Sequence, residues 1–260
     1  MMSIGKPPGC GVCHLLPVSD WNVLCDEELI VLDAGHRPFD YGAGETVYAM
    51  GESNRGVYCV STGTVGIRKL DAEGNSVLLQ MAYPGDVLGY RSFLADGEHR
   101  TTAEALGPSR VCLIDSSTVS QLLGDNPDLG IQFLKRATGE LEQAHDAIIK
   151  GATLSNRARL AHLPLVMTKK HGRVADDGSR SIDLPVSRRD LASMVGTRHE
   201  TLSRIMGRLE EDGIARFSGR NVVVPCLDTL AAEISGSARL LPIAVQARRS
   251  SKFSGKIRKI

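Results

Sequence analysis

Residues 197–213 read TRHETLSRIMGRLEEDG, a run in which apolar residues return at the spacing of an α-helix. On a helix from residue 198 to residue 212, one face is apolar and is expected to be buried. That face consists of Leu202, Ile205, Met206 and Leu209. Thr197 precedes the helix and Glu200 follows three residues later, which predicts a capping box at the N-terminus of the helix.

The opposite face of this helix presents Glu200, Ser203 and Arg204, which are side chains able to read base edges in DNA. An arginine can donate two hydrogen bonds to a guanine, a carboxylate can accept one from a cytosine amino group, and a serine can pair with several edges. The same residues also fit a plain surface, on which Glu200 only caps the helix and Arg204 is a solvated charge. The spacing favours DNA binding and leaves the second interpretation open.

The flanking residues complete a helix-turn-helix pattern. Ser187 followed by RRDLASMVG predicts an N-cap and a short helix that ends at Gly196, so that two helices meet at a tight glycine turn. In GIARFSGRNVVVP (residues 213–225), two strand-like runs flank Ser218 and Gly219, which predicts a β wing. Six side chains around this unit are expected to contact DNA phosphates, although any one of them could equally be an ordinary surface residue. These are Arg188, Arg189, Thr197, Arg198, Arg216 and Arg220.

Upstream, residues 131–151 (IQFLKRATGELEQAHDAIIKG) carry a heptad seam, with spacings that alternate between three and four. The seam positions are Ile131, Leu134, Thr138, Leu141, His145 and Ile148. This pattern predicts a long helix that pairs with a second copy of the chain. A helix that packs on its own β domain is the alternative, although the two polar positions suit a weak dimer better than a core.

Residues 36–115 have the pattern of β structure. Short runs rich in Val, Ile, Leu and Tyr alternate with glycine turns, as in ETVYAMG, GVYCVSTGTVGIRKL and SRVCLID. DAEGN at residues 71–75 predicts a hairpin turn between two such runs. Strands this short and closely spaced favour a small barrel or roll over a βαβ fold.

The composition is that of an ordinary globular protein, with 260 residues, 42% hydrophobic residues, 23% charged residues and a net charge of +1. The sequence has no apolar run of membrane-spanning length and no apolar leader segment, so we expect a cytoplasmic protein without a membrane partner. Thiols are usually reduced there. The sequence also has no glycine-rich phosphate loop and no nucleophile elbow, which argues against an enzyme.

A β-roll, a long helix and a winged helix-turn-helix in this order resemble the CRP/FNR transcription regulators, over residues 20–235. The resemblance rests on GVYCVSTGTVGIRKLDAEGN, PGDVLG and, most specifically, ETLSRIMGRLEEDG. It implies an α+β fold with an N-terminal cyclic-nucleotide-binding-like β-roll, a long dimerisation helix and a C-terminal winged helix-turn-helix. The expected parts are a cysteine-bearing sensor segment (1–35), the β-roll (36–116), the dimerisation helix (117–150), the DNA-binding domain (151–235) and a basic tail (236–260).

The resemblance also implies partners and contact residues. In the FNR branch a Glu, Ser, Arg trio stands at the positions of Glu200, Ser203 and Arg204 and reads a TTGAT half-site, repeated as TTGAT-N4-ATCAA. The expected partners are double-stranded DNA, a second copy of the chain and RNA polymerase. Asp146 lies near the position at which this family has an acidic residue that opposes dimerisation. It therefore joins the seam residues in the expected dimer interface.

FNR proteins hold a four-iron four-sulfur cluster with three N-terminal cysteines and one on a late β-roll strand. The matching residues here are Cys10 and Cys13, which form a C-x2-C pair, and Cys112. Cys25 is the expected fourth ligand, but it follows Cys13 after eleven residues instead of five to seven, and it precedes DEEL as a helix cap would. Cys59 is the alternative fourth ligand. Thiolates are soft ligands that select iron–sulfur clusters. The resemblance implies that such a cluster would sense oxygen or nitric oxide.

Several alternatives to the cluster remain open. The same cysteines fit a zinc site or a thiol/disulfide switch, and a regulator gated by haem or a constitutive DNA-binding protein would share the fold. A cyclic nucleotide is not the expected ligand. Arg100 and Thr101 match the phosphate-binding pair of that branch, but Tyr90 stands after Gly89 where a ribose-binding Glu is expected.

Overall fold

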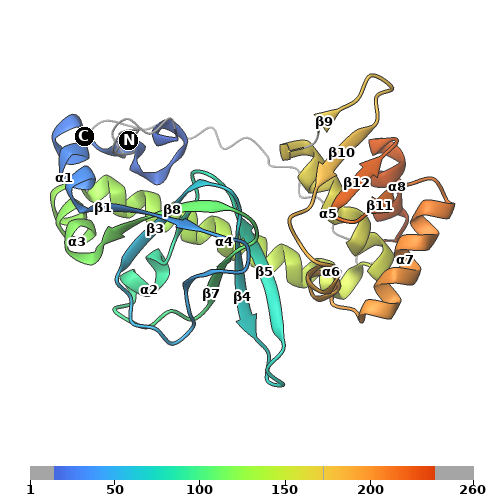
Figure 1. Ribbon diagram of the computed structural model, residues 1–260, viewed down its shortest axis with the longest axis horizontal. Coiled ribbons are helices and arrows are strands. Elements are labelled where there is room, and N and C mark those ends of the chain that lie inside the picture. The colour runs from blue at the N-terminus through green and yellow to red at the C-terminus, as the bar shows by residue number, and fades with distance from the viewer. Residues whose placement is uncertain (1–14, 172, 238–260) are drawn as a thin grey trace, which may run out of the picture.

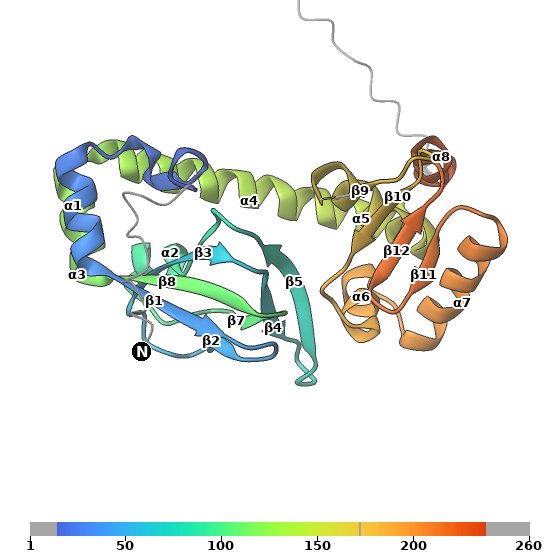
Figure 2. The same cartoon turned by 45° about the horizontal axis from the view of Figure 1, so that its top comes forward.

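The computed structural model describes residues 15–171 and 173–237 and has two lobes joined by a long helix (Figure 1). The first lobe is a β-roll preceded by a short helical segment, and the second is a helical domain with one small sheet. The long helix runs along the first lobe and leads into the second (Figure 2). This is the predicted α+β fold, with the β-roll, the long helix and the winged helix-turn-helix in the predicted order.

The β-roll consists of two four-stranded antiparallel sheets that face each other. The strands of the first sheet, in spatial order, are β1 (His36–Tyr41), β8 (Ser109–Asp115), β3 (Gly56–Thr62) and β6 (Val87–Leu88). Those of the second are β2 (Thr46–Tyr48), β7 (Thr102–Ala105), β4 (Val65–Leu70) and β5 (Ser76–Ala82). Apolar side chains from both sheets, including Tyr58, Val60 and Val65, form a core between them.

The predicted hairpin turn at residues 71–75 is confirmed, because it joins the paired strands β4 and β5. The Asp71 side chain accepts hydrogen bonds from the backbone N–H groups of Glu73 and Asn75. Gly74 has φ +80°, a left-handed conformation that favours glycine. The turn chemistry is therefore local, which explains why the sequence alone identified it.

A second core lies on the outer face of the sheet β1-β8-β3-β6. It is covered by two short 3-10 helices, η2 (Leu16–Val18) and η3 (Asp20–Val23), and by α1 (Asp26–Gly35) and α3 (Ser116–Asp125). The core residues include Trp21, Leu32, Val57, Ile114 and Phe133. The N-terminal segment is thus packed on the β-roll from residue 16 onward.

The predicted continuous helix over residues 117–150 is wrong in one respect, because it is broken at Asn126. Helix α3 ends at Asp125, and α4 (Pro127–Thr153) begins directly after Asn126. The Asn126 side chain accepts a hydrogen bond from the Asp128 N–H, and Pro127 occupies the first turn. An asparagine cap followed by proline starts a new helix, since proline there lacks only an N–H that has no partner within the helix.

The C-terminal lobe is a winged helix-turn-helix, as predicted. Its helices are α5 (Asn156–His171), α6 (Arg188–Val195), α7 (His199–Glu211) and α8 (Leu227–Ser237). Its sheet has the order β11 (Arg216–Ser218), β12 (Asn221–Val224), β10 (Arg180–Asp183) and β9 (Arg173–Val174). The wing hairpin β11–β12 turns at Gly219 and Arg220, next to the predicted Ser218-Gly219 turn. Strands β9 and β10 are short and largely polar, and no sequence pattern predicted them.

Within residues 15–171 and 173–237, the structure has no helix that is both long and apolar enough to cross a membrane.

Candidate nucleic-acid interface and sensor site

The first helix of the helix-turn-helix is capped as its sequence predicts. The Ser187 hydroxyl accepts a hydrogen bond from the Asp190 N–H at 3.1 Å, and the Asp190 carboxylate accepts one from the Ser187 N–H at 3.1 Å. At the other end, Gly196 has φ +71°, and the next N–H, that of Thr197, returns to the carbonyl of Ala192. This turn sets the direction in which the second helix leaves.

The predicted capping box at the start of α7 is wrong. The helix begins at His199 with Arg198 as its cap, and Arg198 makes no side-chain capping bond. Thr197 lies one residue too early, because its N–H completes the glycine turn and its hydroxyl accepts a hydrogen bond from Asn156 at 3.2 Å. Glu200 therefore stands in the first turn of α7 with an exposed side chain that is not used as a cap.

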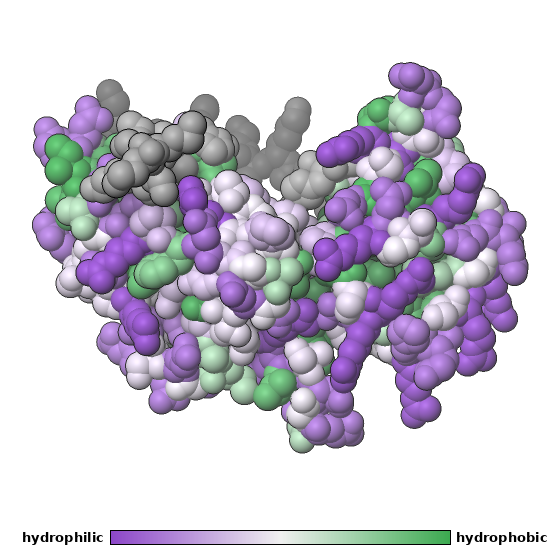
Figure 3. Space-filling model, viewed as in Figure 1, coloured by the Kyte–Doolittle hydropathy of each residue, from purple (hydrophilic) through white to green (hydrophobic). Residues whose placement is uncertain are grey.

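The two faces of α7 divide as the periodicity predicts. Leu202, Met206 and Leu209 are buried, and Ile205 is partly buried against the same core. Glu200, Ser203 and Arg204 are all exposed. In Figure 3 the outer surface of the second lobe is mostly hydrophilic. Three side chains able to contact base edges thus lie on the outer face of a helix whose inner face is anchored in the core. That they contact bases remains a prediction.

The residues predicted to bind phosphates are not equally available. Arg189, Arg198, Arg216 and Arg220 are exposed around α7 and on the wing. Arg188 is partly buried, and its guanidinium donates to the sulfur of Met206 at 2.7 Å. Arg188 is therefore held against the base of α7, whereas the exposed arginines are free to turn toward an approaching duplex.

Helix α4 has one buried and one exposed apolar face. Leu129 and Phe133 are fully buried in the first lobe. The heptad positions face solvent instead, with side chains 65% exposed at Leu134 and 69% exposed at Ile148. The other seam residues, Ile131, Thr138, Leu141 and His145, are also exposed, as is Asp146. The seam is therefore not the face that packs on the β-roll, and whether it pairs with a second helix remains a prediction.

The predicted cluster ligands are only partly described. Cys10 and Cys13 lie outside the described residues. Cys25 is exposed at the N-cap of α1, where its backbone N–H donates to the Glu28 carboxylate at 2.8 Å. Cys112 is buried on β8 and lies directly opposite Cys59 of β3. Among residues 15–171 and 173–237, no three potential metal ligands gather in one place.

Cys59 has an environment that the sequence did not reveal. Its sulfur accepts a hydrogen bond from the Trp21 indole N–H at 2.9 Å. Burial raises the pKa of the Cys59 thiol well above its usual value, and the hydrogen bond from Trp21 opposes this only in part. Trp21 also packs edge-on against Phe133 of α4, with ring centroids 5.7 Å apart. One residue of the N-terminal segment thus touches both the cysteine strand and the long helix.

A buried ion pair reinforces this link between the N-terminal segment and α4. Arg136 of α4 donates to Asp20 at 2.5 Å and to Asp86 at 3.1 Å. Burial raises the pKa of Asp20, and the hydrogen bond from Arg136 partly offsets that effect. Sequence reasoning missed this pair, because Asp20 and Arg136 are 116 residues apart and neither belongs to a recognisable motif.

The β-roll has a group of aromatic side chains around His99. The ring of His99 stacks on Tyr48 at 3.9 Å, and Tyr58 packs beside both. Tyr90, which replaces the expected ribose-binding Glu, is buried with its ring against Phe133. Arg100 is exposed. A phenol at the position of Tyr90 supplies no carboxylate for a ribose hydroxyl.

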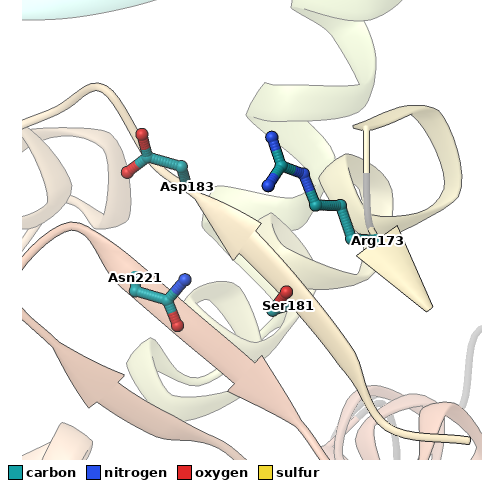
Figure 4. Close-up of a pocket in the computed structure, with 4 residues that line it drawn as sticks. All are labelled: Arg173, Ser181, Asp183 and Asn221. Carbon is teal, nitrogen blue, oxygen red and sulfur yellow. The ribbon is translucent and has the colours of Figure 1, made fainter. Parts of the chain in front are cut away.

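One polar pocket of about 380 Å³ lies on the sheet of the second lobe. Arg173, Ser181, Asp183 and Asn221 line it, from strands β9, β10 and β12 (Figure 4). The lining combines one cationic and one anionic side chain, so it favours neither an anion nor a cation. None of these residues belongs to the predicted interface.

Comparisons with known proteins agree with this architecture. The cyclic nucleotide-binding domain family matches residues 38–126, and the Crp-like helix-turn-helix domain family matches residues 158–233. The fumarate and nitrate reduction regulatory protein of Escherichia coli K12 is 27% identical over 198 residues, which cover 75% of this chain and 77% of that protein. Its counterpart from Klebsiella oxytoca has the same identity and coverage.

Solved structures also match. The structure of FixK2 from Bradyrhizobium japonicum is 31% identical, with a TM-score of 0.66, and the match covers 76% of this chain and 96% of FixK2. A CRP/FNR-family transcriptional regulator from Thermus thermophilus is 21% identical, with a TM-score of 0.64 and coverage of 77% and 100%. At that lower identity the likeness concerns the fold alone.

Proposed function

The chain belongs to the CRP/FNR family of DNA-binding transcription regulators, which are not enzymes, and from this membership we propose a specific mode of sensing. The chain binds a TTGAT-N4-ATCAA-like palindrome as a homodimer. A four-iron four-sulfur cluster held by its cysteines controls dimerisation, so that DNA binding responds to oxygen, redox state or nitric oxide. The regulator acts in the cytoplasm and contacts RNA polymerase at its promoters.

The exposed trio on α7 is the observation that carries the DNA-binding part. Glu200, Ser203 and Arg204 lie within five consecutive residues on a helix whose other side is locked into the core. Arg204 can donate two hydrogen bonds to the guanine of a TTGAT half-site, and Glu200 can accept one from the amino group of the cytosine paired with that guanine. Exposed arginines around α7 and on the wing supply phosphate contacts that set its register.

The exposed seam of α4 supports the homodimer. The four large apolar side chains of the heptad seam face solvent: Ile131, Leu134, Leu141 and Ile148. Exposed apolar stripes of this kind mark association surfaces, and a/d spacing fits a parallel pair of helices. Pairing along a two-fold axis would place two α7 helices about one DNA turn apart, which matches an inverted repeat.

The chemistry of the available donors fits an iron–sulfur cluster. Cys112 is buried on the face of the sheet that the N-terminal segment covers, and that segment follows the Cys10–Cys13 pair directly in sequence. Thiolate sulfur is the ligand that such clusters require. When bound, the cluster supplies a crosslink between these cysteines that oxygen or nitric oxide can destroy.

The contacts of residues 20 and 21 provide the route from the cysteines to the dimer helix. Asp20 forms an ion pair with Arg136, and Trp21 packs on Phe133. A movement of the N-terminal segment would therefore change the contacts of the first three turns of α4. If the crosslink orders this segment, α4 is held in place and pairing is favoured. Loss of the crosslink releases it. A differential stability of roughly 3–5 kcal/mol is enough for such a population shift.

A regulator gated by a thiol/disulfide switch or by a small-molecule effector, without a cluster, is the alternative. One observation favours the thiol version, namely that Cys59 and Cys112 lie directly opposite each other on paired strands. The two versions differ in whether the protein contains iron.

The deciding experiment is to purify the protein without oxygen, assay iron and sulfide, and measure binding to a TTGAT-N4-ATCAA duplex before and after air is admitted. About four irons per chain, visible absorption that bleaches in air, and weaker DNA binding afterwards are the expected results. A colourless, iron-free protein whose DNA binding responds to a disulfide reductant would replace the cluster by the thiol switch. Binding that ignores both oxygen and reductant would refute redox sensing altogether.

A further inference from the structure

We propose that the contact between the two lobes sets the spacing of the half-sites that the dimer recognises, and that Arg68 of the β-roll is the residue that fixes this contact. Arg68 acts without touching DNA, as a positioning residue. The inference rests on the proposed function, because it concerns how a homodimer reads an inverted repeat.

The covalent link between the dimer helix and the second lobe is short and not helical. Helix α4 ends at Thr153 and α5 begins at Asn156, so only Leu154 and Ser155 separate them. Two residues outside a helix are enough for a hinge, because their backbone dihedral angles can change. With this junction as its sole connection, α7 would have no fixed direction relative to α4. A second contact away from the junction removes that freedom.

The second contact is made by two cross-strand partners of the β-roll. Arg68 on β4 and Leu78 on β5 are directly opposite each other, so their side chains project to the same face of the sheet. That face lies against α6 (Figure 2). Arg68 pairs with Asp190, the Leu78 side chain is buried in the core of the second lobe, and the Leu78 N–H donates to the Ser193 hydroxyl at 3.4 Å. An ion pair, apolar packing and a hydrogen bond thus hold one helix together.

The Asp190 carboxylate connects this contact to the geometry of the helix-turn-helix. Its Oδ1 accepts from Arg68, while its Oδ2 accepts from the N–H and the hydroxyl of Ser187 at the start of α6. Arg68 is itself oriented by Glu104 of β7, whose carboxylate lies 3.2 Å from Nε. A buried charge pair of this kind fixes direction as well as distance, because a misaligned pair leaves a charge without its partner. The β-roll therefore sets the position of α6.

The remaining links between α7 and the dimer helix are also well packed. The Thr197 N–H returns to the Ala192 carbonyl and closes the turn between α6 and α7. On the other side, Phe133 buries α4 in the first lobe, and Arg136 ties it to Asp86. Because each α7 is fixed to its own α4, pairing of two α4 helices fixes the separation of the two α7 helices before DNA arrives. Half-site spacing is a direct consequence of that separation.

A change in spacer length tests this rigidity. One added base pair moves a half-site by about 3.4 Å and turns it by about 34–36° around the duplex axis. A dimer with docked lobes cannot follow this movement without breaking the contact, whereas a dimer with released lobes can. The contact should therefore favour a spacer of one length, and its loss should reduce that preference.

The experiment measures the affinity of anaerobically purified protein for TTGAT-N4-ATCAA, for TTGAT-N5-ATCAA and for a single TTGAT half-site by fluorescence anisotropy. The variants are Arg68→Met, the conservative Arg68→Lys and the control Arg110→Met, which removes an exposed pair with Asp40 on the same lobe. We expect the N4-to-N5 affinity ratio to fall at least about tenfold in Arg68→Met. It should recover in part in Arg68→Lys and stay unchanged in Arg110→Met. Affinity for the half-site should stay within about twofold throughout, since Arg68 is remote from the bases.

Every other outcome contradicts the inference. An unchanged N4-to-N5 ratio in Arg68→Met, or a wild-type protein that binds both spacers equally, would show that the contact does not set the spacing. Equal losses on all three duplexes would show a purely structural role. Tighter N4 binding in Arg68→Met would show that the docked arrangement opposes DNA binding. Wild-type protein that binds none of the duplexes better than a scrambled one would refute the proposed operator itself.

A second variant and a measurement without DNA keep the inference testable if Arg68→Met does not fold. Ser193→Ala removes the acceptor of the Leu78 N–H but leaves both charges in place, so it should lower the N4-to-N5 ratio in the same direction by less. Amide hydrogen exchange of the free protein should rise in β5 and α6 of both variants and match wild type in Arg110→Met. Unchanged exchange in both elements would show that these contacts do not hold the lobes together.

Discussion

Arg68 of the β-roll and Asp190 of the helix-turn-helix form a buried ion pair, with Nη1 and Oδ1 2.5 Å apart. The two side chains are only 12% and 11% exposed, and Arg68 also lies 3.2 Å from Glu104. Asp190 is the same residue that caps α6 through Ser187. Leu78 and Leu106 of the β-roll join the hydrophobic core of the second lobe, and β5 lies beside α6 in Figure 2. The first lobe therefore contacts the first helix of the helix-turn-helix directly.

Replacing Arg68 by Met should lower the free energy of unfolding by about 2 kcal/mol, because it leaves the buried carboxylate of Asp190 without its cation. The matched control is Arg110→Met. Arg110 pairs with Asp40 through two bonds, but those side chains are 42% and 71% exposed, so its loss should cost no more than about 0.5 kcal/mol. Urea denaturation measures both values. Equal losses in the two variants would show that the pair between the lobes contributes no more than a surface pair.

Arg204→Ala should weaken binding to the TTGAT-N4-ATCAA duplex about 10- to 100-fold and should reduce discrimination against a substituted guanine, since a bidentate arginine–guanine contact contributes about 1–3 kcal/mol. Arg208→Ala is the control, because Arg208 is also on α7 but lies in its last turn. Fluorescence anisotropy with the consensus and substituted duplexes separates affinity from specificity. If Arg204→Ala weakens both duplexes equally, Arg204 binds phosphate and not a base.

Leu141→Glu should shift the protein toward monomer, because it places a charge in the exposed apolar seam of α4. The dimer dissociation constant should rise at least about tenfold, as expected when a charge is buried without a partner. Gln143→Glu adds the same charge to the same helix outside the heptad seam and should leave the equilibrium nearly unchanged. Sedimentation analysis of anaerobic protein gives both constants. A dimer that tolerates Leu141→Glu must use another surface.

Asp20→Asn should uncouple the N-terminal segment from α4. The neutral amide bonds Arg136 more weakly than the carboxylate does, whereas Asp86 still holds Arg136. We expect amide hydrogen exchange to rise in residues 16–24 and in the first turns of α4, with about 1–2 kcal/mol of local stability lost. Asp40→Asn, at an exposed pair on β1, is the control. Faster exchange confined to η3, with α4 unaffected, would mean that the ion pair does not transmit the position of the segment.

The stability of the β-roll should fall as the pH drops below about 6.5, the usual pKa of histidine. Burial lowers the pKa of His99, which is 2% exposed and stacked on Tyr48. The unfolded chain therefore takes up a proton that the folded chain resists, so unfolding is favoured as the pH falls toward the lowered pKa of the folded state. His99→Gln should show a smaller loss of stability over a fall of about two pH units from neutrality.

Thermal unfolding at several pH values provides the comparison. Burial also lowers the pKa of His162, which remains in the variant, so the pH dependence should be reduced and not abolished. An identical decline in wild type and His99→Gln would show that His99 does not resist protonation.

The DNA-binding half of this protein could be predicted from sequence because its signals are local. Ser187 and Gly196 bound one helix through hydrogen bonds that span a few residues, and the apolar period of α7 separates Leu202 and Met206 from Ser203 and Arg204. The heptad spacing likewise identified the exposed face of α4. The error at Thr197 was also local in origin, since a glycine turn consumed the N–H that was expected to begin the helix.

The sequence by itself thus determined the order of the parts and the two faces of α4 and α7. Only the tertiary structure decided which residues meet across long distances in the chain. Cys59 faces Cys112 because two strands pair in one register, and Arg68 reaches Asp190, 122 residues away, because the lobes dock. Such contacts depend on the packing of whole elements against one another, and no local periodicity or capping pattern encodes that packing.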